Sequence, residues 1–102
     1  MDEISLTGRQ KTRLRGLGQR LAPSLKIGKA GLTPAFVAEL RRRLRSDELV
    51  KLRFQGVERA ERDTLCVDLA RQAECHALGA LGHTALFYRE NPDPAQRRID
   101  RE

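Results

Sequence analysis

The stretch SLKIGKAGLTP, residues 24–34, joins two regular elements and predicts how the chain folds. Its first half fits a short strand over residues 24–27 that ends at Gly28. Its second half contains Thr33 followed by Pro34, which is the sequence signature of a helix N-terminus. A strand that leads through a glycine loop into a helix begins a strand–helix–strand unit. This stretch therefore predicts an α/β fold.

Hydrophobic periodicity and capping signals predict the other elements. In order, the expected elements are a helix between Thr7 and Pro23, a strand over 24–27, a helix from Pro34, a strand over 49–55, a helix over 60–74, and strands over 76–81 and 84–88. The last two strands form a predicted hairpin with its turn at Gly82-His83. Right-handed crossovers between parallel strands then give a two-layer sandwich, a four-stranded mixed sheet with helices on one side. The opposite face, with Lys51 and Arg53, is expected to be open.

The chain is long enough for one small domain. Its 102 residues are 39% hydrophobic but only 4% aromatic, which predicts a modest core of mainly aliphatic side chains. We expect this domain to span residues 1–90. Two prolines and many charges follow Asn91, so residues 91–102 are expected to form a flexible charged tail.

Hydropathy and cysteine usage favour a cytoplasmic protein. No apolar run approaches the roughly 20 residues of a membrane span, and residues 1–4 lack the basic start of a signal peptide. Cys66 and Cys75 lie nine residues apart in a segment read as helix, where they would project to opposite sides. We therefore expect two reduced thiols and no membrane partner.

Positive charge is concentrated in the first half of the chain. Residues 1–53 hold 13 Lys and Arg against 5 Asp and Glu, a net charge of +8. Residues 54–102 hold 7 basic and 9 acidic residues, a net charge of −2. This asymmetry favours a face that binds a polyanion. The alternative is a basic surface that has no ligand.

The loop Gly28-Lys29-Ala30-Gly31 is the strongest candidate binding element. Two glycines allow a tight turn and a close approach of backbone to a ligand. The following helix directs its N–H groups and positive end toward this loop, and Lys26 and Lys29 add charge. Phosphate suits these features, and backbone contacts to it grip without reading bases. The alternative is an ordinary strand-to-helix turn.

Further cations could extend a phosphate-binding surface. Arg9, Arg13 and Arg20 share one face of the first helix. The same helix also carries Lys11. Lys51 and Arg53 lie on the strand face that is expected to be open. A solvated surface is the alternative for the helix. The arginines at 41, 42, 43 and 45 wrap around their helix, so only part of them could meet one ligand, and their role stays open.

The sequence offers no other chemistry. It lacks the glycine and lysine spacing of a Walker loop or of a dinucleotide fold. No metal-ligand spacing and no nucleophile–base pair stands out, so no metal, cofactor, small-molecule substrate or catalytic residue is expected. Phe54 and Tyr88 lie among apolar strand residues and should pack in the core. No exposed aromatic platform for stacking bases is therefore expected.

Three blocks of sequence resemble one family. They are LTGRQK at residues 6–11, IGKAGLT at 27–33, and GHT at 82–84 leading into FYR at 87–89. In this order and spacing they resemble the CRM domain, named for chloroplast RNA splicing and ribosome maturation, and more closely the stand-alone bacterial YhbY-like proteins. The resemblance covers residues 4–90. It departs at Ala30, where many members have a polar residue, and at Phe87, where an aliphatic residue is more usual.

The resemblance implies a fold like the C-terminal domain of bacterial translation initiation factor 3. It also implies RNA binding through the loop at residues 28–31 and association with precursors of the large ribosomal subunit. We therefore expect a non-enzymatic RNA-binding assembly factor whose partner is ribosomal RNA, with ribosomal proteins as further candidates. The alternatives are an adaptor that binds proteins on ribosomal particles through its acidic third helix and tail, an RNA chaperone or splicing-type factor, and a DNA-binding protein.

Overall fold

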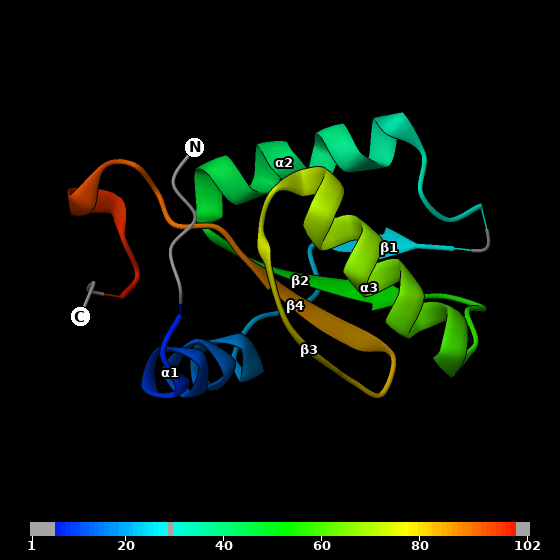
Figure 1. The fold of residues 1–102 in the computed structure, drawn as a ribbon, viewed down its shortest axis with the longest axis horizontal. Coiled ribbons are helices and arrows are strands. Elements are labelled where there is room, and N and C mark those ends of the chain that lie inside the picture. Colours follow the sequence, from blue (N-terminus) through cyan, green and yellow to red (C-terminus); the bar gives the residue numbers. More distant parts are fainter. Residues whose placement is uncertain (1–5, 29, 100–102) are drawn as a thin grey trace.

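The computed structural model describes residues 6–28 and 30–99, which form a four-stranded sheet with helices on both faces (Figure 1). The elements are α1 (Gly8–Gln19), β1 (Leu25–Ile27), α2 (Pro34–Asp47), β2 (Leu49–Phe54), α3 (Arg59–Ala73), β3 (His76–Leu81), β4 (Thr84–Tyr88) and the short 3₁₀ helix η1 (Pro94–Gln96). Each predicted helix and strand is present, with bounds close to those expected. The helix starts at Thr7 and Thr33 carry the predicted side-chain caps.

The strand order is β1-β2-β4-β3. β1 pairs with β2 in parallel, and β4 pairs antiparallel with both β2 and β3. β3 therefore runs parallel to β2, with β4 inserted between them. This arrangement confirms the predicted α/β class and the mixed four-stranded sheet.

Alternation along β2 divides the core into two halves. Val50, Leu52 and Phe54 face α2 and α3, whose buried residues join them in one cluster. Leu49 points to the opposite face and packs with Leu14 of α1 in a second cluster. In Figure 1 the sheet accordingly lies between α1 on one side and α2 and α3 on the other.

The expectation of helices on one side only is wrong for α1. Leu14 is completely buried, and Gly18 lies so close to β4 that an added Cβ would fall 2.6 Å from Leu86 Cδ2. Helical periodicity identifies the side of α1 that must be buried, but it does not say which face of the sheet receives it. Here α1 covers part of the face that was expected to be open.

The segment after β4 also differs from the flexible tail expected there. Residues 91–99 pack back onto the domain, and Ile99 is only 5% exposed within the α1-side cluster. The buried Glu48 carboxylate accepts hydrogen bonds from Asn91 N at 2.5 Å and Arg98 N at 2.6 Å. The segment is thus held by the buried side chain of Ile99 and by the carboxylate of Glu48, although its composition resembles that of a tail. Glu48 precedes its two N–H donors by 43 and 50 residues in the sequence. Residues 100–102 lie outside the described part.

Candidate nucleic-acid interface

The chain turns tightly from Gly28 to Gly31, between β1 and α2. Gly31 N donates to Gly28 O at 3.0 Å. Gly31 has φ of 67°, in the left-handed region that favours glycine. Gly28 needs no such angle, and a Cβ there would meet only Gln55 O, at 3.9 Å. Ala30 is exposed, whereas Lys29 lies outside the described residues. The loop is thus a turn whose outer side is open to a ligand.

The start of α2 offers fewer free N–H groups than the sequence suggested. Thr33 Oγ1 accepts the Phe36 N–H at 3.1 Å, and Thr33 O accepts the Val37 N–H at 3.0 Å. Pro34 has no N–H to offer. The chain therefore satisfies much of this helix terminus itself. Any anion at the loop would depend mainly on the turn backbone and on nearby cations.

Two of the predicted cations lie side by side next to the loop. Lys26 of β1 and Arg53 of β2 are register partners and both are exposed. They point to the α1 side of the sheet, because their neighbours Ile27 and Phe54 point into the other half of the core. Gln55 N donates to Ile27 O at 2.8 Å, which joins the ends of β1 and β2 just before the turn. Among the described residues, none forms an ion pair with Lys26 or Arg53.

The basic residues of α1 lie further from the loop. α1 packs at the end of the sheet where β2 begins and β4 ends. The loop follows the last residue of β1, at the other end of the sheet, beside the end of β2 (Figure 1). Six strand residues, or roughly 17 Å, separate these two ends of β2. The sequence did not reveal this separation, because neighbours along the chain were taken to be neighbours in space.

The cations of α1 also divide between two flanks. Arg15 Nε donates to Leu78 O of β3 at 2.9 Å, so this flank faces the β3 edge. Lys11 shares this flank, because it precedes Arg15 by one turn. Arg9, Arg13 and Arg20 lie roughly 120–160° away around the helix and therefore on the flank toward β1. All four predicted residues are exposed, but only the second flank lies on the side of Lys26 and Arg53.

Lys51 is occupied by the fold. It is half-buried, and its Nζ donates to Gly18 O and Leu21 O, each at 3.2 Å. Gly18 lies in the last turn of α1 and Leu21 just beyond its C-cap, so the ammonium group sits at the negative end of the helix dipole. The expectation of Lys51 on an open face is corrected: its charge anchors α1, and Arg53 remains exposed beyond it.

The arginines at positions 41–45 are partly engaged with acids of their own helix. Arg42 and Arg43 approach Glu39 at 2.6 Å and 3.7 Å. The hydrogen bond from Arg42 holds the pKa of Glu39 below its usual value. Part of this charge is therefore neutralised within α2.

The described residues gather few other reactive groups. No three His, Cys, Asp or Glu side chains among them come together as a metal site would require. Cys66 and Cys75 are free, half-buried thiols, and burial raises the pKa of Cys75 to about 12. No helix within the described ranges has the length and hydrophobicity needed to cross a membrane.

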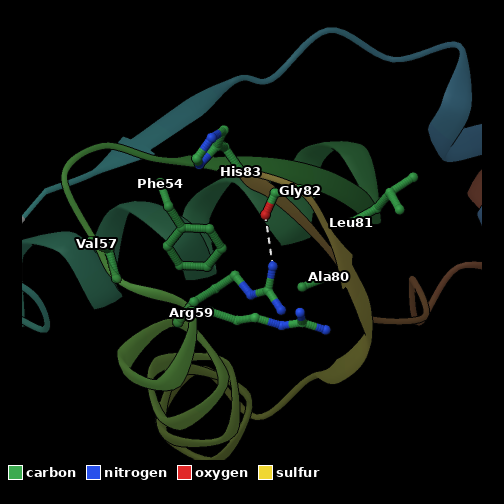
Figure 2. Close-up of a pocket in the computed structure, with 8 residues that line it drawn as sticks. Phe54, Val57, Arg59, Ala80, Leu81, Gly82 and His83 are labelled. Atoms are coloured by element: carbon green, nitrogen blue, oxygen red, sulfur yellow. Dashed lines mark hydrogen bonds between the residues drawn. The ribbon is translucent and has the colours of Figure 1, made fainter.

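An open pocket at the same end of the sheet as the loop was not predicted. The start of α3 and the β3–β4 turn enclose it, and Phe54 lies at its base (Figure 2). It contains the side chains of Arg59 and Arg62. Both arginines lie in the half of the chain whose net charge is negative, so the charge distribution along the sequence did not indicate a site there.

The chain is similar to a family of known proteins over nearly all of its length. The model of the CRS1 / YhbY (CRM) domain matches residues 6–89. The probable RNA-binding protein PA4753 of Pseudomonas aeruginosa is 36% identical over 91 residues, which cover 89% of this chain and 88% of that protein. An RNA-binding protein of Haemophilus influenzae is 28% identical over 89 residues, which cover 87% and 90%.

A solved structure has the same fold. The hypothetical protein SAV1595 from Staphylococcus aureus superimposes with a TM-score of 0.80 and 24% sequence identity, over 94% of this chain and 100% of that protein. At this identity the likeness concerns the fold alone. The family match spans the loop, the paired cations Lys26 and Arg53, and the β3–β4 hairpin. The chain therefore belongs to the CRS1 / YhbY (CRM) domain family.

Proposed function

We propose that this chain is a non-enzymatic RNA-binding protein that grips the phosphate backbone at the turn of residues 28–31. The observation that carries the proposal is the open turn, with Gly31 at φ of 67°, directly beside the exposed pair Lys26 and Arg53. The two relatives described above match most of this chain, and they are named as a probable RNA-binding protein and an RNA-binding protein. The geometry of the turn and the similarity to these relatives both support RNA as the ligand.

The binding surface would start at the turn and continue over the β1–β2 edge. Gly28 and Gly31 would admit a phosphate close to the backbone, and Lys29, Lys26 and Arg53 would supply positive charge. Arg20, Arg13 and Arg9 would extend the surface along the β1 flank of α1, and Lys11 would contact only an RNA wide enough to reach the other flank. Phosphate contacts position a protein without reading sequence, so RNA shape would decide where it binds.

The proposed target is a precursor of the large ribosomal subunit in the cytoplasm. This part rests on the resemblance to the stand-alone bacterial members of the family. Sedimentation of a cell lysate on a sucrose gradient tests it: the protein should migrate with large-subunit precursors and leave those fractions after ribonuclease treatment. Migration with protein that survives the nuclease would favour the adaptor alternative instead.

Direct RNA binding can be tested by filter binding to structured fragments of large-subunit RNA at several salt concentrations. The logarithm of the binding constant should fall linearly with the logarithm of salt, by about 0.7–0.9 per neutralised phosphate. Gly28→Asp should fold, because a Cβ at Gly28 meets nothing closer than 3.9 Å. It should lose about tenfold or more in affinity, since a carboxylate would stand at the phosphate position.

The matched control is Gln72→Glu, which changes the net charge equally at an exposed position of α3. It should bind RNA within about twofold of the wild type. A salt-independent affinity, or equal losses in Gly28→Asp and Gln72→Glu, would contradict the proposal. Thermal unfolding of both variants shows whether a loss of binding reflects a loss of fold.

A further inference from the structure

The pocket between α3 and the β3–β4 turn has the size of a small-molecule site. Its volume is about 380 Å³, within the range of roughly 300–1,000 Å³ typical of such sites. Phe54, Val57 and Ala80 supply apolar surface. Leu81 at its rim is 82% exposed, an apolar side chain that the fold itself leaves almost uncovered.

The two arginines of this pocket are in different states. Arg62 is fixed: its Nη1 donates to Gly82 O at 2.7 Å, its Nη2 lies 3.0 Å from Asp63 Oδ1, and its side chain is only 13% exposed. Arg59 is exposed, and within residues 6–28 and 30–99 nothing is hydrogen-bonded or ion-paired to its side chain. Figure 2 shows the Arg59 guanidinium extending beneath the hairpin toward Ala80. Arg62 therefore shapes the pocket, and Arg59 is left to meet a ligand.

The charged side chains that line this pocket are those of Arg59 and Arg62. Glu58, Glu61 and Asp63 are their neighbours at the start of α3, but none of the three lines the pocket. Arg62 is held by Gly82 and Asp63, so of the two arginines it is Arg59 whose guanidinium has no partner among the described residues. A flat group that can lie on the apolar base and against the plane of this guanidinium suits the lining.

The pocket lies close to the proposed phosphate grip. Phe54 N donates to His83 O at 2.7 Å, and Gln55 N donates to Ile27 O at 2.8 Å, so the hairpin turn, the end of β2 and the end of β1 are joined side by side. Neighbouring strands lie about 4.8 Å apart, which places β1 and β4 roughly 10 Å from each other. One RNA molecule held at the turn can therefore present a nearby nucleotide to the pocket.

We infer that this pocket holds one unpaired base of the bound RNA, stacked against the Arg59 guanidinium over Phe54 and Ala80. The inference rests on the proposed function and adds to it a preference for RNA with an unpaired nucleotide. Among the described residues, Phe54 and Tyr88 are 3% and 0% exposed, so neither provides a platform on the surface. Arg59 takes the role that an exposed aromatic side chain has in other single-strand binders.

The test compares three RNA hairpins that share one stem sequence: a fully paired stem, the same stem with one unpaired adenosine, and the same stem with an abasic residue at that position. The wild type should bind the adenosine bulge about three- to tenfold more tightly than the other two. Arg59→Gln should abolish this preference and leave the affinity for the paired stem within about twofold. Arg71→Gln is the matched control on α3, since its side chain is 74% exposed and remote from the pocket, and it should keep the preference.

Each other outcome overturns the inference in a distinct way. Equal affinity for the abasic and adenosine bulges would mean that no base is held. An equal loss on all three hairpins in Arg59→Gln would make Arg59 a phosphate contact, and an unchanged preference would place the base elsewhere. Absence of binding to all three hairpins by the wild type would instead be the failure of the proposed function, on which the inference depends.

Discussion

Gly28 and Gly31 stand at the two ends of one turn, but only one of them is required by its backbone angle. At Gly31 φ is 67°, where an L side chain costs roughly 1–2 kcal/mol. At Gly28 an added Cβ meets only a carbonyl oxygen, at ordinary contact distance. Folding therefore requires glycine at position 31, whereas glycine at position 28 would serve only the access of a ligand to the backbone.

Alanine at each position tests this separation. Gly31→Ala should lower the free energy of unfolding by about 1–2 kcal/mol, because the side chain is held in the left-handed region. Gly28→Ala should leave it unchanged or raise it by up to about 1 kcal/mol, because alanine restricts the unfolded chain. Urea denaturation measures both values. Equal stabilities of the two variants would contradict the turn described here.

Single residues also show the limits of reading the sequence. The register of β1 and β2 brings Lys26 next to Arg53, a pairing that the strand pattern alone did not specify. Arg59 was missed, because no motif marks it and acidic residues surround it in the sequence. Its significance comes from Arg62, which binds the hairpin turn and leaves Arg59 without a partner among the described residues. Such a difference between two arginines three residues apart exists only in the folded chain.

At the scale of elements, caps and periodicity were sufficient to predict where helices and strands lie. They could not place α1, since an apolar stripe can pack on either face of a sheet. The position of α1 also affects the candidate site. Lys51 and Arg53 lie on the same face of β2 but have different surroundings. Lys51 lies under α1 and binds two of its carbonyls, whereas Arg53 lies beyond α1 in solvent.

Substitution of Lys51 should therefore affect stability, whereas substitution of Arg53 should affect RNA binding. Lys51→Ala should lower the free energy of unfolding by about 1–3 kcal/mol, because two carbonyls of α1 lose a charged donor. Arg53→Ala should change stability by less than about 0.5 kcal/mol. It should weaken RNA binding on all sequences and reduce the salt slope by about one. Thermal or urea unfolding and filter binding measure the two effects. Equal loss of RNA affinity in both variants, without loss of stability in Lys51→Ala, would contradict the anchoring role.

At the scale of the molecule, the candidate binding residues and the contacts that hold α1 and the C-terminal segment lie at opposite ends of the sheet. The turn, the cation pair Lys26 and Arg53, and the pocket of Arg59 gather at the end where β2 finishes. Glu48, Ile99 and the core of α1 gather at the end where β2 begins. Substitutions that alter ligand binding can therefore be distant from the contacts that hold α1 and the C-terminal segment.

The C-terminal segment shows why the whole molecule could not be read from composition. Residues 91–99 are polar enough to resemble a tail, yet Ile99 packs with Leu14 and Tyr88 in the α1-side cluster. Two backbone N–H groups of this segment reach Glu48, the C-cap of α2, whose φ is positive at 65°. A buried carboxylate needs such donors, because burial without them is costly. Only the tertiary structure reveals that the acceptor and its donors belong together.

This arrangement predicts that the segment stabilises the domain. Ile99→Ala should lower the free energy of unfolding by about 2–4 kcal/mol, because a side chain that is 5% exposed leaves the core. A chain that ends at residue 90 should lose at least as much, since Glu48 also loses the N–H donors of Asn91 and Arg98. Leu81→Ala, at an 82% exposed position, is the control and should stay within about 0.5 kcal/mol. If the shortened chain unfolds at the same urea concentration as the full chain, residues 91–99 contribute no stability, and the domain ends near residue 90 as its composition first suggested.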